Sequence, residues 1–320
     1  MLRIAYLTLF SACIACQCAA GRSDLKLVTE ANDDLTTILD RTYKVSSTDY
    51  FNVFYDPYAA DYDKISYLLD LAYHHFESLF NSYNFVLRPP QAKLTWIAFK
   101  NKESFNRYAI ETEGRDLSWL SGYYSTGTNI VAVVTPEKMS KWQVKAERNQ
   151  TPDVIACPPD AQTDLVKIVH ETAHQLSFNT GLQKRGVKYP IWASEGLAMF
   201  FERSLLSEYF HSCRYTSLRA RRLTELYRRG NLIPLDEFIT MTRLDETSSA
   251  IDIYAQAWGL FHFLCEHRTK ALRTYFSNLY AHDPGWKSER TLHDEFVKAF
   301  GSLDQLDRQW MRFLETLSVR

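Results

Sequence analysis

The sequence predicts an α+β fold with two lobes in a chain of 320 residues. Strand-like and helical segments alternate between residues 50 and 134, whereas the strong patterns after residue 163 are all helical. The composition is 46% hydrophobic and 14% aromatic, which is enough apolar material for a sizeable core. We therefore expect a mixed α/β lobe followed by a helical lobe, with a cleft at their junction.

Residues 1–20 have the pattern of an export signal: a positive residue, an apolar run too short to span a membrane, and then small residues. A second interpretation is a bacterial lipoprotein signal, because Cys13 and Cys16 follow segments that loosely match a lipobox. That reading would attach the chain to a membrane through an N-terminal lipid. Either interpretation predicts an exported protein that is periplasmic, held in the cell envelope or secreted. Residues 21–47 are expected to be a spacer, and the polar stretch from 21 to about 43 could also form an N-terminal helix.

The first lobe is expected to occupy residues 48–181. Runs of aromatic and β-branched residues predict strands, and apolar residues every three or four positions predict helices. These patterns place strands at 50–55 and 93–99, helices at 61–83 and 102–110, and a hairpin at 122–134. Residues 137–162 are polar and rich in proline, so we expect a long loop. It contains a glycosylation sequon at Asn149 that has meaning only in a eukaryotic host.

The next segment carries the strongest chemical signal, His170-Glu171-Thr-Ala-His174. The apolar run before it predicts a helix, on which His170 and His174 lie one turn apart on the same face. Two imidazoles placed in this way can bind one metal ion. Glu171 lies about 100° further round the helix, where it can act as a base without being a ligand. The alternative is an ordinary helix that happens to carry two histidines.

A third ligand is predicted on a second helix. The first helix is expected to end near Gly181, since glycine favours a left-handed C-terminal cap. After a short loop, Pro190 is well placed to open the next helix, which carries Glu195. Catalytic zinc sites use three protein ligands and leave one position for water. His170, His174 and Glu195 are therefore the expected Zn²⁺ ligands, and Gln175, Asn179 and Glu202 are candidates to orient them, unless they are simply polar helix residues.

The second lobe, residues 182–320, is expected to be helical throughout, with further helices at 214–229, 254–265, 270–281, 291–300 and 303–317. The first of these carries six arginines, which could form a wall for an anionic substrate. A solvated amphipathic face is the favoured interpretation. Three cysteines remain after the signal, Cys157, Cys213 and Cys265, so at least one is unpaired within the chain. No pairing can be assigned, and each also fits a small buried residue.

At the residues of the metal motif, the sequence resembles the gluzincins, zinc metallopeptidases with a downstream glutamate ligand that include the thermolysin-like enzymes. The flanking segments His170–Gly181 and Trp192–Ala198 resemble more closely an uncharacterised bacterial family, a domain of unknown function with a peptidase-MA-like fold. The resemblance extends over about residues 48–317 and implies a zincin-like, two-lobe metallopeptidase fold. It implies His170, His174 and Glu195 as ligands and Glu171 as general base.

The resemblance also implies an oxyanion-stabilising side chain from the helical lobe, for which Tyr254 is the candidate. The strand at 129–134 would correspond to the edge strand that pairs with an extended peptide. Thermolysin-like enzymes have an aspartate four residues after the ligand glutamate, where this chain has Met199. The chain also lacks the Gly-x-Met-Glu-Asn segment by which related aminopeptidases hold a free N-terminus, which favours an endopeptidase.

The function expected from the sequence is thus zinc-dependent hydrolysis of a peptide or protein substrate. One alternative is a zincin-fold extracellular binding module that holds zinc but has no catalytic activity. Another is a metal-free structural domain. The net charge of −1 gives no reason to expect nucleic-acid binding. The sequence does not indicate the natural substrate or the oligomeric state.

Overall fold

The structure is a computed structural model that describes residue 35 and residues 38–58, 60–135, 162–210, 215–244 and 249–319. Several sequence predictions lie outside these residues. They are the export signal at 1–20, most of the loop expected at 137–162 with its sequon, and the cysteines Cys157 and Cys213. Cys265 is described and is a buried free thiol, as expected for a small core residue.

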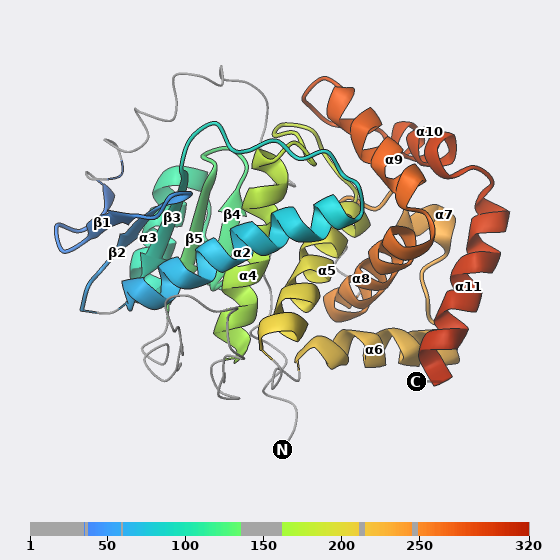
Figure 1. Ribbon diagram of the computed structural model, residues 1–320, viewed down its shortest axis with the longest axis horizontal. Coiled ribbons are helices and arrows are strands. Elements are labelled where there is room, and N and C mark those ends of the chain that lie inside the picture. The colour runs from blue at the N-terminus through green and yellow to red at the C-terminus, as the bar shows by residue number, and fades with distance from the viewer. Residues whose placement is uncertain are drawn as a thin grey trace.

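The first lobe is built on a mixed five-stranded sheet (Figure 1). In chain order its strands are β1 (Lys44–Ser47), β2 (Phe51–Tyr55), β3 (Leu94–Phe99), β4 (Gly122–Ser125) and β5 (Ile130–Val134). Their order across the sheet is β1-β2-β3-β5-β4. The central strands β2, β3 and β5 run parallel, and β1 and β4 close the two edges in antiparallel pairing.

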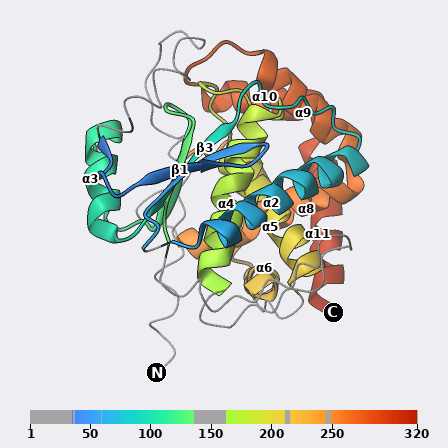
Figure 2. The same cartoon turned by 60° about the vertical axis from the view of Figure 1, so that its left-hand side comes forward.

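Helices cover both faces of this sheet (Figure 2). One face packs against α3 (Lys102–Glu113), and the other packs against α2 (Tyr62–Ser82) and α4 (Gln162–Asn179). The register explains the two cores. Paired residues Val53, Trp96 and Val131 point to the α2–α4 side, and the next set, Phe54, Ile97 and Ala132, points to the α3 side. Both sets are buried, as expected for parallel strands covered on two faces.

The remainder of the described chain is helical and forms the second lobe (Figure 1). Its helices are α5 (Ile191–Tyr209), α6 (Tyr215–Arg229), α7 (Leu235–Phe238), α8 (Ala250–His267), α9 (Thr269–Ala281), α10 (Glu289–Phe300) and α11 (Leu303–Val319). The core on the α2–α4 side of the sheet continues into this lobe through α4 and α5. None of the described helices combines the length and the apolar character that a membrane span requires.

The predicted α+β class with two lobes is confirmed, and most of the elements predicted before residue 135 are present within a few residues. Two details differ. β1 lies within residues 21–47, where a spacer was expected. The expected edge strand at 129–134 is wrong, because β5 lies between β3 and β4. β4 is the terminal strand on that side, and its residues are buried, so strand addition by a peptide is not supported there.

Glu195 is brought into place by close packing between α5 and α8, which make the most extensive helix contact of the second lobe. Gly196 lies at this contact. A Cβ atom at that position would come within 2.5 Å of the carbonyl oxygen of Ala257 and 2.9 Å of the Cβ of Phe261. Only glycine allows the backbones to approach this closely, and the neighbouring Glu195 is thereby held at the level of α4.

Candidate metal centre

Helix α4 lies between the sheet and the second lobe and is buried along nearly its whole length (Figure 1). A buried helix must satisfy the polar side chains that it carries. Two of them tie α4 to the sheet. Gln175 Nε2 donates to the carbonyls of Thr95, at 2.9 Å, and Asn129, at 3.0 Å. Lys167 Nζ donates to the carbonyl of Val134 at 2.8 Å and pairs with Asp164 at 3.1 Å.

The C-terminal end of α4 is held in a similar way. Asn179 and Asn129 exchange two side-chain hydrogen bonds of 2.9 and 2.7 Å, and Tyr124 donates its hydroxyl to Asn129 at 2.8 Å. Asn129 adopts a positive φ of 60°, which asparagine tolerates better than most residues. Gln175 and Asn179, two candidates to orient a metal ligand, therefore anchor the helix to the sheet instead.

The face of α4 turned toward α5 carries the three expected ligands. The Nε2 atoms of His170 and His174 lie 3.2 Å apart. One carboxylate oxygen of Glu195 is 3.2 Å from His170 Nε2, and the other is 3.5 Å from His174 Nε2. Among the described residues, these three are the group of histidine, cysteine and acidic side chains whose geometry could hold a metal ion. The spacing of the motif and the return of the chain through Gly186 and Pro190 thus bring the three side chains to one point.

The distances fit a tetrahedral ion. With metal–ligand bonds of about 2.0–2.1 Å, two ligands of a tetrahedral zinc are separated by about 3.3 Å. The two imidazole nitrogens are 3.2 Å apart, which matches that value, and each of them lies 3.2 or 3.5 Å from a different oxygen of Glu195. The donor set of two imidazoles and one carboxylate is also one that zinc accepts. His170 and Glu195 keep exposed fractions of 4% and 6%, whereas His174 is fully buried, so the side of the cluster near His170 and Glu195 is the one nearest to solvent.

A fourth residue, Glu202, contacts His170 from behind. Its Oε2 atom lies 3.4 Å from His170 Nδ1, on the opposite edge of the ring from Nε2. Glu202 is seven residues after Glu195, and seven residues are close to two helical turns, so both carboxylates share one face of α5. Glu202 is fully buried and is paired with Arg219 of α6. Of the three candidates to orient a ligand, Glu202 is the one in contact with the cluster.

The electrostatics of the cluster favour a bound positive charge. Burial alone would lower the pKa of His170, but the hydrogen bonds with Glu195 and Glu202 outweigh it and raise the pKa to about 10. Burial alone would raise the pKa of Glu195, but His174 and His170 lower it well below the ordinary range of a carboxyl group. The protein without metal therefore holds a proton among these groups. Metal binding would release it, because ligand imidazoles must be neutral.

The two remaining site candidates lie in different surroundings. Glu171 is fully buried next to His170 in the chain, and its charge acts on both His170 and Lys167. Tyr254 lies in the first turn of α8, where it is half-buried against the main core. The close contacts described for the cluster come from α4 and α5. The proposed role of Tyr254 at an oxyanion therefore stays a prediction.

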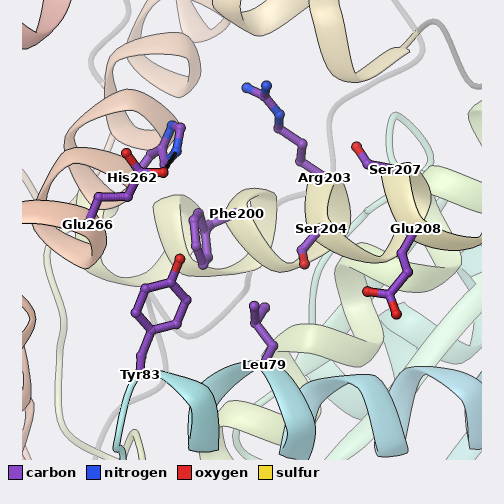
Figure 3. A pocket seen from close by; sticks show the side chains of 9 residues that line it. All are labelled: Leu79, Tyr83, Phe200, Arg203, Ser204, Ser207, Glu208, His262 and Glu266. Carbon is purple, nitrogen blue, oxygen red and sulfur yellow. Dashed lines mark hydrogen bonds and ion pairs between the residues drawn. The ribbon is translucent and has the colours of Figure 1, made fainter.

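A second cluster of histidine and carboxylate lies on another side of α5. His75 of α2 has Nε2 at 2.9 Å from Ser204 Oγ and Nδ1 at 3.5 Å from Glu208 Oε2. Ser204 and Glu208 line a cavity of about 400 Å³. Figure 3 shows this cavity between α2, α5 and α8, with a lining of Leu79, Tyr83, Phe200, Arg203, Ser204, Ser207, Glu208, His262 and Glu266. No local sequence pattern predicts this cluster, since its members are far apart in the chain.

Comparison with known proteins is informative only at the level of a domain. Residues 164–285 match the model of a family described as a protein of unknown function (DUF1570). The match runs from α4 through α9 and includes the three expected ligands, Glu171 and Tyr254. It agrees with the expected resemblance to an uncharacterised domain family, and it carries no assigned activity. A search of the curated proteins found no match.

Proposed function

We propose that the protein is a zinc-dependent peptidase whose metal is held by His170, His174 and Glu195. The observation that carries the proposal is the convergence of three buried residues, whose ligand atoms lie within 4.8 Å of one another, with the two imidazole nitrogens 3.2 Å apart and Glu171 adjacent in the helix. A structural zinc site usually fills its fourth position with a protein ligand. Among the described residues, only these three converge, which is the number found in catalytic sites.

A zinc ion at this site would supply Lewis acidity, polarising a peptide carbonyl and lowering the pKa of water. The remaining steps belong to the protein. Glu171 takes a proton from the attacking water and later delivers it to the departing amine. Tyr254 is the proposed donor to the developing oxyanion.

The test replaces Glu171 by Gln, which removes the base and preserves the size of the side chain. We expect hydrolysis of a peptide library, followed by mass spectrometry, to fall by at least about 10²-fold to 10⁴-fold. Zinc content should stay at about one ion per chain. The matched control is Glu208→Gln, which makes the same change on α5 at a carboxylate that contacts His75 rather than the cluster. Its activity should equal that of the wild type.

Other outcomes separate the alternatives. Full activity in Glu171→Gln would exclude the proposed mechanism. Zinc binding by the wild type without cleavage of any library peptide would favour the non-catalytic binding module. Absence of zinc after purification without chelators would leave a metal-free domain.

A further inference from the structure

Arg219 was expected to lie on the solvated or substrate-binding face of an arginine-rich helix, and the structure directs it inward instead. Its Nη1 atom donates to Glu202 Oε1 at 2.5 Å and its Nη2 atom to Oε2 at 3.1 Å. The pair is bidentate, the geometry in which a guanidinium binds a carboxylate most specifically. Arg219 belongs to α6, so the contact links a third helix to the metal cluster of α4 and α5.

The carboxylate that Arg219 holds is the one behind His170. Glu202 Oε2 is shared between Arg219 Nη2, at 3.1 Å, and His170 Nδ1, at 3.4 Å. An ionised Glu202 accepts the proton of Nδ1, which leaves the lone pair of Nε2 pointing at His174 and Glu195. A Glu202 side chain displaced from this position would not impose that tautomer and ring orientation.

Arg219 supplies a fixed positive charge beside Glu202. The side chain of Glu202 is fully buried, and both of its oxygens accept hydrogen bonds from the guanidinium. The bidentate pair therefore fixes the carboxylate in the position from which it contacts His170. His174 has no comparable support, since its Nδ1 atom has no hydrogen-bond partner in the described part of the chain. Of the two histidines, His170 is thus the one whose Nδ1 atom is held by a described side chain, and that side chain is Glu202.

We propose that Arg219 is a positioning residue for the metal site, acting through Glu202 to orient His170. This inference rests on the proposed zinc site. It makes the affinity of that site for metal depend on the position of α6, which carries Arg219. The sequence signal was ambiguous because α6 carries many arginines, and only the tertiary structure separates the one that enters the interior.

The same helix offers a matched control. Arg222, three residues later, makes an equally bidentate pair with Asp252 of α8, at 2.5 and 2.9 Å. Replacing either arginine with methionine removes one paired guanidinium from α6. Only Arg219 reaches a residue that contacts an expected ligand.

The experiment measures zinc affinity of the full chain by competition with a chromophoric chelator, in the wild type, Arg219→Met and Arg222→Met. We expect Arg219→Met to weaken zinc binding by about 10-fold to 100-fold, the range known for partners that orient metal ligands. Arg222→Met should stay within about 2-fold of the wild type. Arg219→Lys keeps the positive charge but loses the bidentate guanidinium geometry, so its zinc affinity should lie between those of Arg219→Met and the wild type. The Co²⁺-substituted protein should show an altered visible spectrum in Arg219→Met only.

A double-variant experiment tests whether Arg219 acts through Glu202. Glu202→Gln should weaken zinc binding as Arg219→Met does, and the double variant should lose no more than either single variant. The double variant also removes both charges, so it carries the test if Arg219→Met alone fails to fold because Glu202 is buried unpaired.

An affinity of Arg219→Met within 2-fold of the wild type, or a loss equal to that of Arg222→Met, would overturn the inference and leave the zinc site intact. Additive losses in the double variant would also overturn it. A wild type that binds no zinc would overturn both the inference and the proposed function.

Discussion

Helix α5 takes part in two clusters of histidine and carboxylate, and among the described residues only one of them has the geometry of a metal site. At the first, two imidazoles and Glu195 direct their ligand atoms at one another. At the second, the single imidazole of His75 lies between Ser204 and Glu208, with one ring nitrogen facing each. Both contain a buried histidine and a carboxylate from α5.

The pKa values of the two histidines move in opposite directions. Burial would lower the pKa of His170, but two carboxylates reverse the effect and raise it. Burial lowers the pKa of His75, and Glu208, which is largely exposed, compensates only in part. Burial beside a carboxylate is therefore not enough to indicate a metal site. What distinguishes the first cluster is that the ligand atoms of two imidazoles and one carboxylate converge on one point.

The largest expected effect comes from removing a converging ligand. His174→Ala or Glu195→Ala should abolish stoichiometric zinc binding, because two protein ligands rarely hold zinc against a chelator. His75→Ala makes the same change at the second cluster and should leave the zinc content at about one ion per chain. Metal analysis of the purified proteins, dialysed against metal-free buffer, is the measurement.

Metal removal extends the same comparison. A metal ion that binds only the folded protein stabilises it by RT ln(1 + [L]/Kd), so a chelator should lower the Tm of the wild type and of His75→Ala. The Tm of His174→Ala should not respond. Equal responses in all three proteins would show that the first cluster is not where the metal binds.

A smaller effect is expected from the backbone that carries Glu195. Gly196→Ala would place a Cβ atom 2.5 Å from the carbonyl oxygen of Ala257, so α5 and α8 must move apart. Overpacking of this kind costs about 1–3 kcal/mol of unfolding free energy. Because Glu195 is the adjacent residue, we also expect weaker zinc binding, whereas the contacts of Ser204 with His75 should persist. Urea denaturation and chelator competition measure the two effects.

The control for Gly196→Ala is Ser207→Ala, at an exposed position on the same helix, which should change the unfolding free energy by less than about 0.5 kcal/mol. A Gly196→Ala protein as stable as the wild type would mean that the approach of α5 to α8 does not restrict the position of Glu195.

The two clusters also differ in how far the sequence could predict them. His170 and His174 are one helical turn apart, so local geometry alone places them together. Glu195 follows through a short loop between a capping glycine and a helix-opening proline, signals that are also local. The contacts of Glu202 with Arg219 and of His75 with Ser204 join residues separated by 17 and 129 positions. Such pairings depend on how helices dock, which no local pattern specifies.

The same limit applies to the sheet. Alternation and composition identified the strands at β2, β3, β4 and β5, but not which of them is the edge. After β3 the chain passes through α3 to the outer strand β4, and the hairpin then turns inward and places β5 between β3 and β4. A hairpin that turned the other way would satisfy the same pattern of residues, so the position of β5 was predicted wrongly.

The smallest effect concerns the second cluster and pH. The pKa of His75 lies below its ordinary value of 6.5 in the folded protein because the ring is buried. The unfolded chain therefore binds a proton more readily, and stability should fall as the pH drops below about 6.5.

His75→Gln keeps a hydrogen-bonding group beside Ser204 but cannot take up this proton. Between pH 7.5 and 5.5, the unfolding free energy of the variant should fall less than that of the wild type. The difference between the two losses should be about 1 kcal/mol or less. His262 also has a pKa lowered by burial, so some acid sensitivity remains in the variant. An identical loss in both proteins would mean that His75 is protonated equally in the folded and unfolded states, and that the two clusters do not differ in the way their surroundings indicate.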